Sequence, residues 1–157
     1  MIRIENENII LRSVDSSDID TILLWENSSA EPLYGVYEEQ YTREDVALFV
    51  ENQQRYSVAE TEQLRLMICS LSGERLGCID LTEYDGESAS VSILIFDLYN
   101  RGKGFGTKAL QMLISYVQSL GLQRLYATVL PENIVSISLF KKAGFEQETD
   151  KRYLRLL

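Results

Sequence analysis

The stretch Ala89–Ala109, ASVSILIFDLYNRGKGFGTKA, joins an apolar run, a polar break, three alternating glycines and the start of a helical pattern. Apolar residues alternate with Ser90 and Ser92 and continue through Ile93–Phe96, which predicts a strand buried on at least one face. Apolar residues then recur at helical spacing after Phe105, at Leu110, Leu113, Ile114 and Val117. The sequence therefore predicts a strand, a tight loop and a helix in direct succession.

The loop has the composition of an anion site. Gly102, Gly104 and Gly106 let the backbone approach a ligand closely and point several N–H groups at one place. The helix that follows adds the positive end of its dipole, and Arg101 and Lys103 add positive charge in a chain of net charge -9. A pyrophosphate is the expected ligand, and a purely structural turn is the alternative.

Two familiar nucleotide motifs do not fit this loop. A dinucleotide-binding fingerprint needs Gly-x-Gly-x-x-Gly, whereas the glycines here are spaced Gly-x-Gly-x-Gly. A Walker loop needs Gly-Lys-Ser/Thr after four intervening residues, and the sequence lacks it.

Two motifs resemble the GCN5-related N-acetyltransferases (GNAT). Arg101, Gly104 and Gly106 match the acetyl-CoA loop of that family, Arg/Gln-x-x-Gly-x-Gly/Ala, between a strand and a helix. The segment Asn133–Phe145 is similar to a second family segment, Asn-x-x-Ser/Ala followed by an aromatic residue and Lys-x-Gly-Phe. The resemblance covers nearly the whole chain.

The amino-terminal part points to one branch of this family. Leu11-Arg12 precedes an acidic helix start, and Trp25–Asn27 follows it. This arrangement is similar to the RimJ/RimL-like and spermidine-acetyltransferase-like branch.

The resemblance implies a fold and a cofactor. It implies one domain over residues 1–157, an α/β (α+β) fold with a mixed, mostly antiparallel twisted sheet, a splayed parallel strand pair and about four flanking helices. Acetyl-CoA would lie between the strands that end near Phe96 and Leu130. The implied cofactor-binding residues are Ile95, Phe96, Arg101, Gly102, Lys103, Gly104, Phe105, Gly106, Thr107, Asn133 and Phe140. For Asn133, a plain helix N-cap is an equally good interpretation.

The implied chemistry is acyl transfer from the thioester to an amine. The amine must lose a proton, and an amide N–H near Ile95 or Phe96 is placed to stabilise the oxyanion. Phe140 stands where many family members have a tyrosine that acts as general acid, and phenylalanine cannot donate a proton. A regulatory acyl-CoA-binding module without catalysis is therefore the alternative function, and transfer of a longer acyl group is a further alternative.

Two carboxylates are candidates for the general base. Asp80 and Glu83 lie three positions apart in a predicted strand, so their side chains point to opposite faces. Glu83, at the strand end near a turn, is the predicted base. Both carboxylates facing solvent is the alternative.

Composition narrows the remaining possibilities. A chain of 157 residues with 45% hydrophobic content can form one sizeable core, and the absence of histidine excludes His-based triads and the usual His-rich metal sites. We expect no metal, Cys69 and Cys78 as core residues, and a cytoplasmic protein without a membrane segment. The acidic balance argues against nucleic acid and fits a cationic amine substrate, small molecule or peptide, although it fits mere solubility as well.

A candidate acceptor-binding loop lies early in the chain. The segment Ser28–Tyr41 concentrates tyrosines and carboxylates, which suit an ammonium group through cation–π and charge contacts. The residues chosen are Glu31, Tyr37 and Glu38. An ordinary connector whose tyrosines pack on the core is the alternative.

The rest of the chain predicts a simple order of elements. We expect a strand over Asn8–Val14, helices capped by Asp15–Asp18 and Thr42, and a hairpin of Leu64–Leu71 with Leu76–Tyr84. Only twelve residues follow Phe145, where the family has two more strands. We therefore expect the last strand to be missing or very short. The exposed edge could then be covered by another subunit, so a homodimer is one expected assembly.

Overall fold

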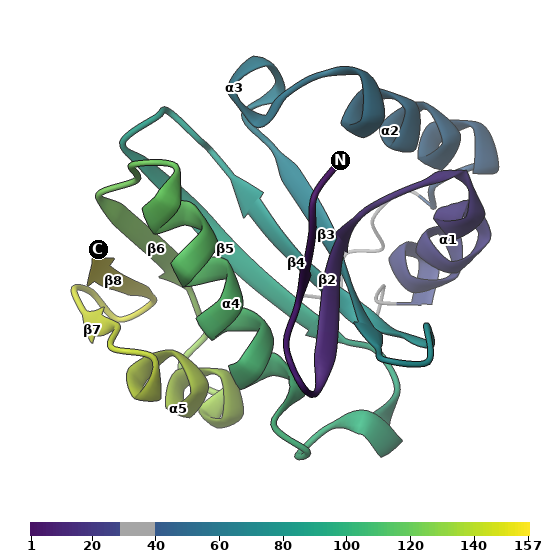
Figure 1. Cartoon of the computed structure of the whole chain (residues 1–157). Coiled ribbons are helices and arrows are strands. Elements are labelled where there is room, and N and C mark those ends of the chain that lie inside the picture. Colours follow the sequence, from purple (N-terminus) through teal and green to yellow (C-terminus); the bar gives the residue numbers. More distant parts are fainter. Residues whose placement is uncertain (29–39) are drawn as a thin grey trace.

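The computed structural model describes residues 1–28 and 40–157, and over these ranges the chain forms eight strands and five α-helices (Figure 1). The strands are β1 (Arg3–Glu5), β2 (Ile9–Ser13), β3 (Leu64–Ser70), β4 (Arg75–Thr82), β5 (Ser88–Ile95), β6 (Arg124–Thr128), β7 (Glu146–Gln147) and β8 (Arg152–Leu156). The helices are α1 (Ile19–Ser28), α2 (Arg43–Arg55), α3 (Val58–Thr61), α4 (Phe105–Ser119) and α5 (Ile134–Lys142), with short 3-10 helices η1 (Ser16–Asp18) and η2 (Leu98–Asn100).

All eight strands belong to one sheet in the order β1-β2-β3-β4-β5-β6-β8-β7. Every neighbouring pair is antiparallel except β5 and β6, which run parallel because α4 crosses over between them. The predicted mixed, mostly antiparallel sheet with one parallel pair is thereby confirmed.

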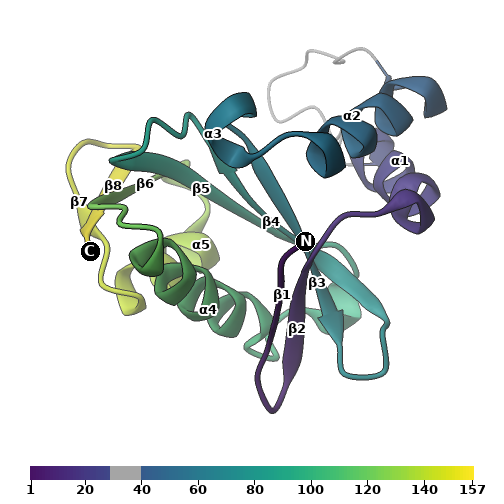
Figure 2. The same ribbon diagram turned by 45° about the horizontal axis from the view of Figure 1, so that its top comes forward.

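The sheet is buried on both faces by different helices (Figure 2). Because side chains alternate along a strand, Leu66 and Ile68 of β3 pack with α4 on one face, while Met67 and Cys69 pack with α1 and α2 on the other. Cys78 of β4 also lies in the second core, so both cysteines are free core residues as predicted.

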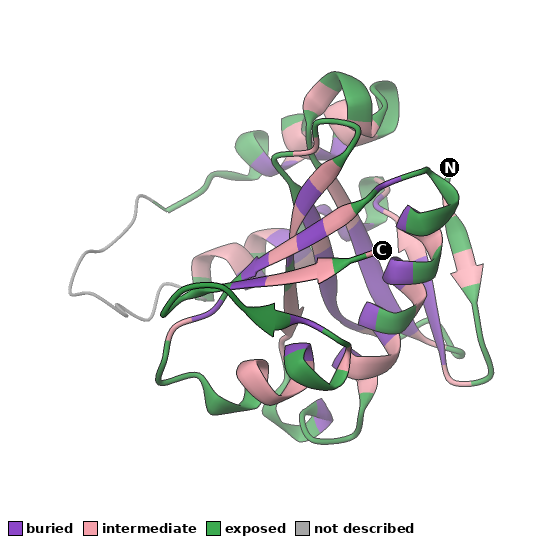
Figure 3. Cartoon of the chain, turned by 90° about the vertical axis from the view of Figure 1, so that its left-hand side faces the viewer, coloured by how far each residue is buried: buried purple, intermediate pink, exposed green. Residues whose placement is uncertain are grey.

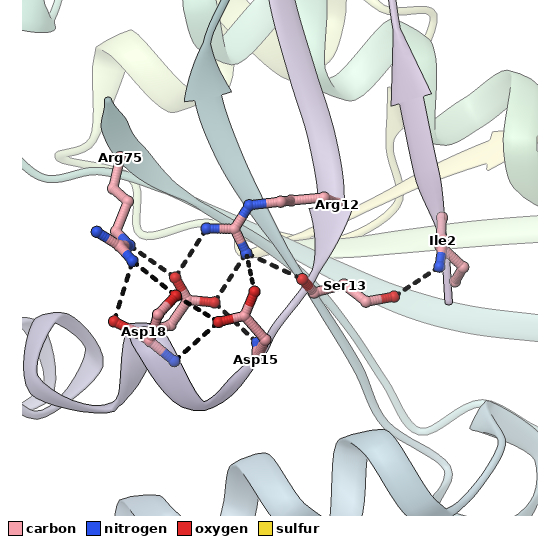
Figure 4. A network of polar contacts seen from close by, with 7 residues as sticks. Ile2, Arg12, Ser13, Asp15, Asp18 and Arg75 are labelled. Atoms are coloured by element: carbon pink, nitrogen blue, oxygen red, sulfur yellow. Dashed lines mark hydrogen bonds and ion pairs between the residues drawn. The ribbon is translucent and has the colours of Figure 1, made fainter. Parts of the chain in front are cut away.

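A buried carboxylate fixes the start of α1 to the sheet (Figure 4). Asp18 is fully buried and accepts hydrogen bonds from both Nη atoms of Arg12, each at 2.8 Å, and from Nε of Arg75 at 2.6 Å. It also accepts from the backbone N–H of Asp15, whose own side chain caps η1. The predicted cap at Asp15–Asp18 is thus also an anchor to β2 and β4.

Three features differ from the expectations. The strand β1 and the one-turn helix α3 were not predicted. The last strand is neither missing nor very short, because β8 has five residues and pairs with β6 along its length. Both family strands fit because β7 takes only two residues, Glu146 and Gln147, which are exposed at the sheet edge (Figure 3).

Candidate active site

The parallel strands β5 and β6 pair only at their beginnings. Their register joins Ser88 to Arg124, Ala89 to Leu125 and Ser90 to Tyr126, with no pair beyond Ser90 although β5 continues to Ile95. We call the unpaired remainder of the two facing strand edges the β5–β6 splay. It leads directly to the glycine loop.

The register with β4 determines which backbone groups of β5 face the splay. The Phe96 N–H donates to the Leu76 carbonyl at 3.0 Å, and hydrogen-bonded positions alternate along an antiparallel pair. The N–H and C=O groups of Val91, Ile93 and Ile95 therefore point away from β4, toward β6. The amide of Phe96 is used within the sheet and is not available to an oxyanion, whereas the amide of Ile95 faces the splay.

The loop after β5 carries a run of N–H groups without acceptors. Within residues 1–28 and 40–157, no group accepts a hydrogen bond from an amide of residues 102–107. Gly102 and Gly104 have φ angles of 75° and 83°, a left-handed conformation that glycine adopts freely, and Gly104 is the N-cap of α4. Free amides at a helix N-terminus attract an anion.

The other loop residues have distinct roles. Arg101 donates from Nε to the Ile95 carbonyl at 2.9 Å, so its guanidinium group lies between the loop and the end of β5. The Lys103 ammonium lies 3.5 Å from the ring centroid of Tyr99. Gly106 is buried, and a Cβ there would lie 3.0 Å from Cδ1 of Leu139, so this glycine lets α4 and α5 approach each other.

The second motif forms the start and the buried face of α5. The Asn133 side chain accepts from the Ser136 N–H at 3.2 Å, which confirms the N-cap interpretation. A contact of Asn133 with the cofactor stays a prediction. Phe140 is buried and packs edge-on against Phe145, with ring centroids 5.1 Å apart.

The predicted base, Glu83, lies level with the start of the splay and far from the glycine loop. Glu83 is exposed and follows the end of β4, where Thr82 pairs with Ser90 at the start of the splay. The glycine loop lies beyond the other end of β5, where Ile95 pairs with Gly77. At about 3.3 Å per residue, roughly 20 Å of strand separates Glu83 from that level. Because β4 and β5 are antiparallel, the end of β4 that precedes the turn lies beside the beginning of β5 and not beside its end.

Asp80, the other carboxylate, lines a cavity beside β5. This inner cavity, of about 220 Å³, lies on the α1 and α2 face of the sheet, and its wall includes Trp25, Cys78, Asp80, Ser92 and Ile93. Asp80 and Ser92 are cross-strand partners. Ile93 contributes to this wall and also turns its backbone toward the splay.

An arginine joins two carboxylates at this cavity. Arg65 of β3 donates from Nε and Nη2 to the two oxygens of Asp80, at 2.9 and 2.6 Å, and from Nη1 to Glu26 of α1 at 2.8 Å. Burial lowers the pKa of the Arg65 guanidinium, but the hydrogen bonds and charges of its partners outweigh burial and raise that pKa above its usual range. Burial also raises the pKa of the Cys78 thiol to about 12, so this thiol stays protonated.

A larger outer cavity, of about 820 Å³, adjoins α1 and α2 and shares Glu26 and Arg65 with the inner one. Its wall includes Tyr41, whose backbone N–H and C=O bond to the side chain of Asn27. The predicted acceptor residues Glu31, Tyr37 and Glu38 lie outside the described residues.

Sequence reasoning did not single out Arg65, Glu26 and Ile93, which line the inner cavity. A signal for Arg65 was present, because it shares the strand face of Met67 and Cys69, which are buried. A charged residue on a core-facing position needs a partner. No local pattern identified Glu26 as that partner, since the two residues are 39 positions apart.

Among the described residues, no group of three or more His, Cys, Asp or Glu side chains is arranged to hold a metal ion. No helix within residues 1–28 and 40–157 has the length and apolar character needed to cross a membrane.

The described residues join a splayed parallel strand pair to amides without acceptors at a helix N-terminus, which is the arrangement that the family resemblance predicted. The sequence profile of the acetyltransferase (GNAT) domain matches residues 8–146. The chain belongs to the GNAT family.

Several known relatives match this chain in sequence. An uncharacterized N-acetyltransferase of Bacillus subtilis, YnaD, is 25% identical over 92% of this chain and 83% of its own length. The uncharacterized protein MJ1062 of Methanocaldococcus jannaschii is 21% identical over 91% of this chain, which spans only 29% of that relative. The uncharacterized N-acetyltransferase YobR of Bacillus subtilis is 30% identical over 44% of this chain, and the match spans only 28% of that relative.

Two solved structures share the fold. Spermidine N-acetyltransferase from Vibrio cholerae, in complex with CoA and spermine, has a TM-score of 0.81 at 20% identity, covering 96% of both chains. RimL, a ribosomal L7/L12 alpha-N-protein acetyltransferase in complex with coenzyme A, has a TM-score of 0.80 at 15% identity, covering 99% of this chain and 98% of RimL.

Proposed function

We propose that this chain is an N-acetyltransferase that moves an acetyl group from acetyl-CoA to a primary amine by direct attack in a ternary complex. The observation that carries the proposal is the run of free amides at residues 102–107, placed between the end of β5 and the start of α4. Such amides fit the diphosphate of coenzyme A. The backbone groups of β5 that face the splay can pair with the amides of its pantetheine arm, as an added strand would.

The residues supply orientation and charge stabilisation. The Ile95 N–H faces the splay and is the proposed donor to the oxyanion, and Ile93 offers a second N–H on the same edge. When bound, acetyl-CoA supplies the thioester that the amine attacks. Phe140 has no proton to give, so protonation of the departing coenzyme A thiolate would need water or another donor. Asn133 and the guanidinium of Arg101 are the remaining proposed contacts.

The acceptor is proposed to be a cationic amine. The family neighbours include proteins whose names specify spermidine and a ribosomal protein amino terminus, and both are amines. The acidic balance of this chain and the two carboxylates at the cavities fit an ammonium group.

Two matched glycine variants test the loop. A Cβ at Gly104 meets no atom within 4 Å, and the same holds for Gly86, which has a similar φ of 91° in the turn before β5. Both alanine variants therefore carry the same backbone strain, of about 1–2 kcal/mol. Only Gly104→Ala places a methyl group against the proposed diphosphate. By calorimetry we expect Gly104→Ala to weaken coenzyme A binding at least tenfold and Gly86→Ala to leave it within twofold.

Turnover separates this proposal from the alternative. Release of free thiol from acetyl-CoA with a panel of amines supports the enzyme. Tight coenzyme A binding without turnover of polyamines, peptide amino termini or aminoglycosides favours a regulatory module. If the wild type does not bind coenzyme A, both the enzyme and the regulatory module are contradicted.

A further inference from the structure

The inner cavity brings a fixed carboxylate next to the strand that faces the cofactor. Asp80 of β4 lies directly across from Ser92 of β5, and cross-strand Cβ atoms are about 5 Å apart. The next residue, Ile93, lines the same cavity and directs its backbone into the β5–β6 splay. An amine bound at Asp80 would therefore approach the splay from the side opposite to α4.

The contacts of Asp80 leave it little freedom. Both of its oxygens accept hydrogen bonds from Arg65, and the Asp80 and Arg65 side chains are only 18% and 14% exposed. Arg65 is held in turn by Glu26 and by the ring of Phe49, 5.2 Å from the guanidinium carbon. Burying an Arg–carboxylate pair costs desolvation energy, so stability alone does not explain why this pair lies in the wall of a cavity.

The charge of the cluster indicates which group it binds. Among the described residues, two carboxylates pair with the one guanidinium of Arg65, and these three groups have a net charge of about -1. The other walls of the cavity include Trp25 and Leu94. A carboxylate has about four acceptor positions, and after two hydrogen bonds from Arg65 and one with the Cys78 thiol, Asp80 keeps about one of them. A cation with hydrogen-bond donors, small enough for about 220 Å³, satisfies both the charge and the remaining acceptor position.

We propose that Asp80 binds the ammonium group of the acceptor beside Ile93, and that Arg65 is a positioning residue that holds this carboxylate by both oxygens. The proposal rests on the N-acetyltransferase function proposed above and names the residues that select the acceptor. Glu26 holds the free side of Arg65 and links the inner cavity to the outer one, where the remainder of a longer amine lies.

Binding to the coenzyme-A-saturated protein tests this directly. The probes are spermidine, hexylamine and trialanine amide, with hexanol as the uncharged counterpart of hexylamine. We expect Asp80→Asn to weaken amine binding at least tenfold while hexanol binding and coenzyme A binding stay within twofold of wild type. Asp80→Glu restores part of the amine affinity. Arg65→Lys keeps the positive charge and loses the bidentate hydrogen bond to Asp80. We expect it to raise KM for the amine several-fold and to change kcat less than threefold.

The control variant breaks a similar ion pair elsewhere. Asp20 of α1 pairs with Arg43 at 3.0 Å, and both side chains are exposed and outside the two cavities. Asp20→Asn should leave amine affinity unchanged.

Equal amine binding by wild type and Asp80→Asn, or no binding of any amine probe to the wild type, would overturn the role of Asp80. If the wild type does not bind coenzyme A, the proposed function itself is overturned. If Asp80→Asn does not fold, Asp80→Glu and Arg65→Lys are used instead. Each should weaken the binding of hexylamine and leave the binding of hexanol unchanged, and equal effects on both probes would overturn the role of Asp80.

Discussion

At the scale of single residues, Asp18 shows how a buried charge couples the fold to pH. Burial raises the pKa of its carboxyl group, but hydrogen bonds from Arg12 and Arg75 outweigh burial and bring the pKa down to about 2, from an ordinary value of 3.8. A depressed pKa means that folding favours the ionised form. The resulting stabilisation, on the order of 2 kcal/mol, is fully present above about pH 4 and is lost as the pH falls toward 2.

Replacing this carboxylate should therefore remove stability and part of its pH dependence. In Asp18→Asn, two arginines lose their shared anion, and we expect the free energy of unfolding at pH 7 to fall by about 3–5 kcal/mol. The loss of stability between pH 4 and pH 2 should also be smaller than in the wild type. Urea unfolding at several pH values measures both effects. The exposed carboxylate of Asp20 serves as control, since its replacement by asparagine should cost less than about 1 kcal/mol. An unchanged acid limb in Asp18→Asn would contradict the assignment.

Local patterns predicted some structural features and not others. The glycine loop before α4 and the helix cap at Asn133 were predicted correctly because both depend on immediate neighbours in the sequence. The role of Glu83 as the base stays a prediction, and its location could not be predicted locally because it depends on the register between β4 and β5. Arg65 was missed because its role depends on partners 15 and 39 positions away, which become neighbours only in the folded sheet.

At the scale of elements, Gly77 sets how closely β4 and β5 approach. A Cβ at this position would lie 1.8 Å from the carbonyl oxygen of Leu94 and 3.0 Å from Cα of Ile95. Both are backbone atoms, so a side chain at position 77 must push the end of β5 away. This end is the one that continues into the glycine loop.

We expect Gly77→Ala to destabilise the protein by roughly 3 kcal/mol or more, at the upper end of what overpacking costs. It should also weaken coenzyme A binding, because the backbone of Ile95 moves with the strand. Thermal and urea unfolding measure the first effect, and calorimetry measures the second. Gly86→Ala is the matched control, with open space around its Cβ and an expected cost of about 1–2 kcal/mol. Near-wild-type stability of Gly77→Ala would mean that the two strands can separate there at little cost.

The element order also shows the limits of counting residues. The strand, loop and helix of Ala89–Ala109 followed from alternation and helical spacing, and β5, the loop and α4 appear where expected. The carboxy-terminal prediction was wrong because it assumed strands of ordinary length. β7 consists of Glu146–Gln147, and the turn before Arg152 leaves a full strand for β8.

At the scale of the whole molecule, this correction bears on assembly. The expected open edge came from a missing last strand, and β8 is present between β6 and β7. The homodimer stays a prediction, and its original reason no longer applies. The edge strand β7 exposes two polar residues, and a short polar edge is a poor template for pairing with another chain.

The proposed ligand, coenzyme A, should stabilise the molecule as a whole. Three residue pairs hold β5 to β6, and the first half of the sheet also meets the C-terminal part through α4 and the core around it. Coenzyme A in the splay would contact the loop, β5 and α5 together. At a concentration one hundred times its Kd it should raise the free energy of unfolding by about 2.7 kcal/mol, which corresponds to a Tm increase of roughly 5–10 °C for a chain of this size. Differential scanning fluorimetry measures the shift, which Gly104→Ala should lose and Gly86→Ala should keep. A transition in which β6, α5 and β8 melt first and without response to coenzyme A would contradict a ligand that bridges the splay.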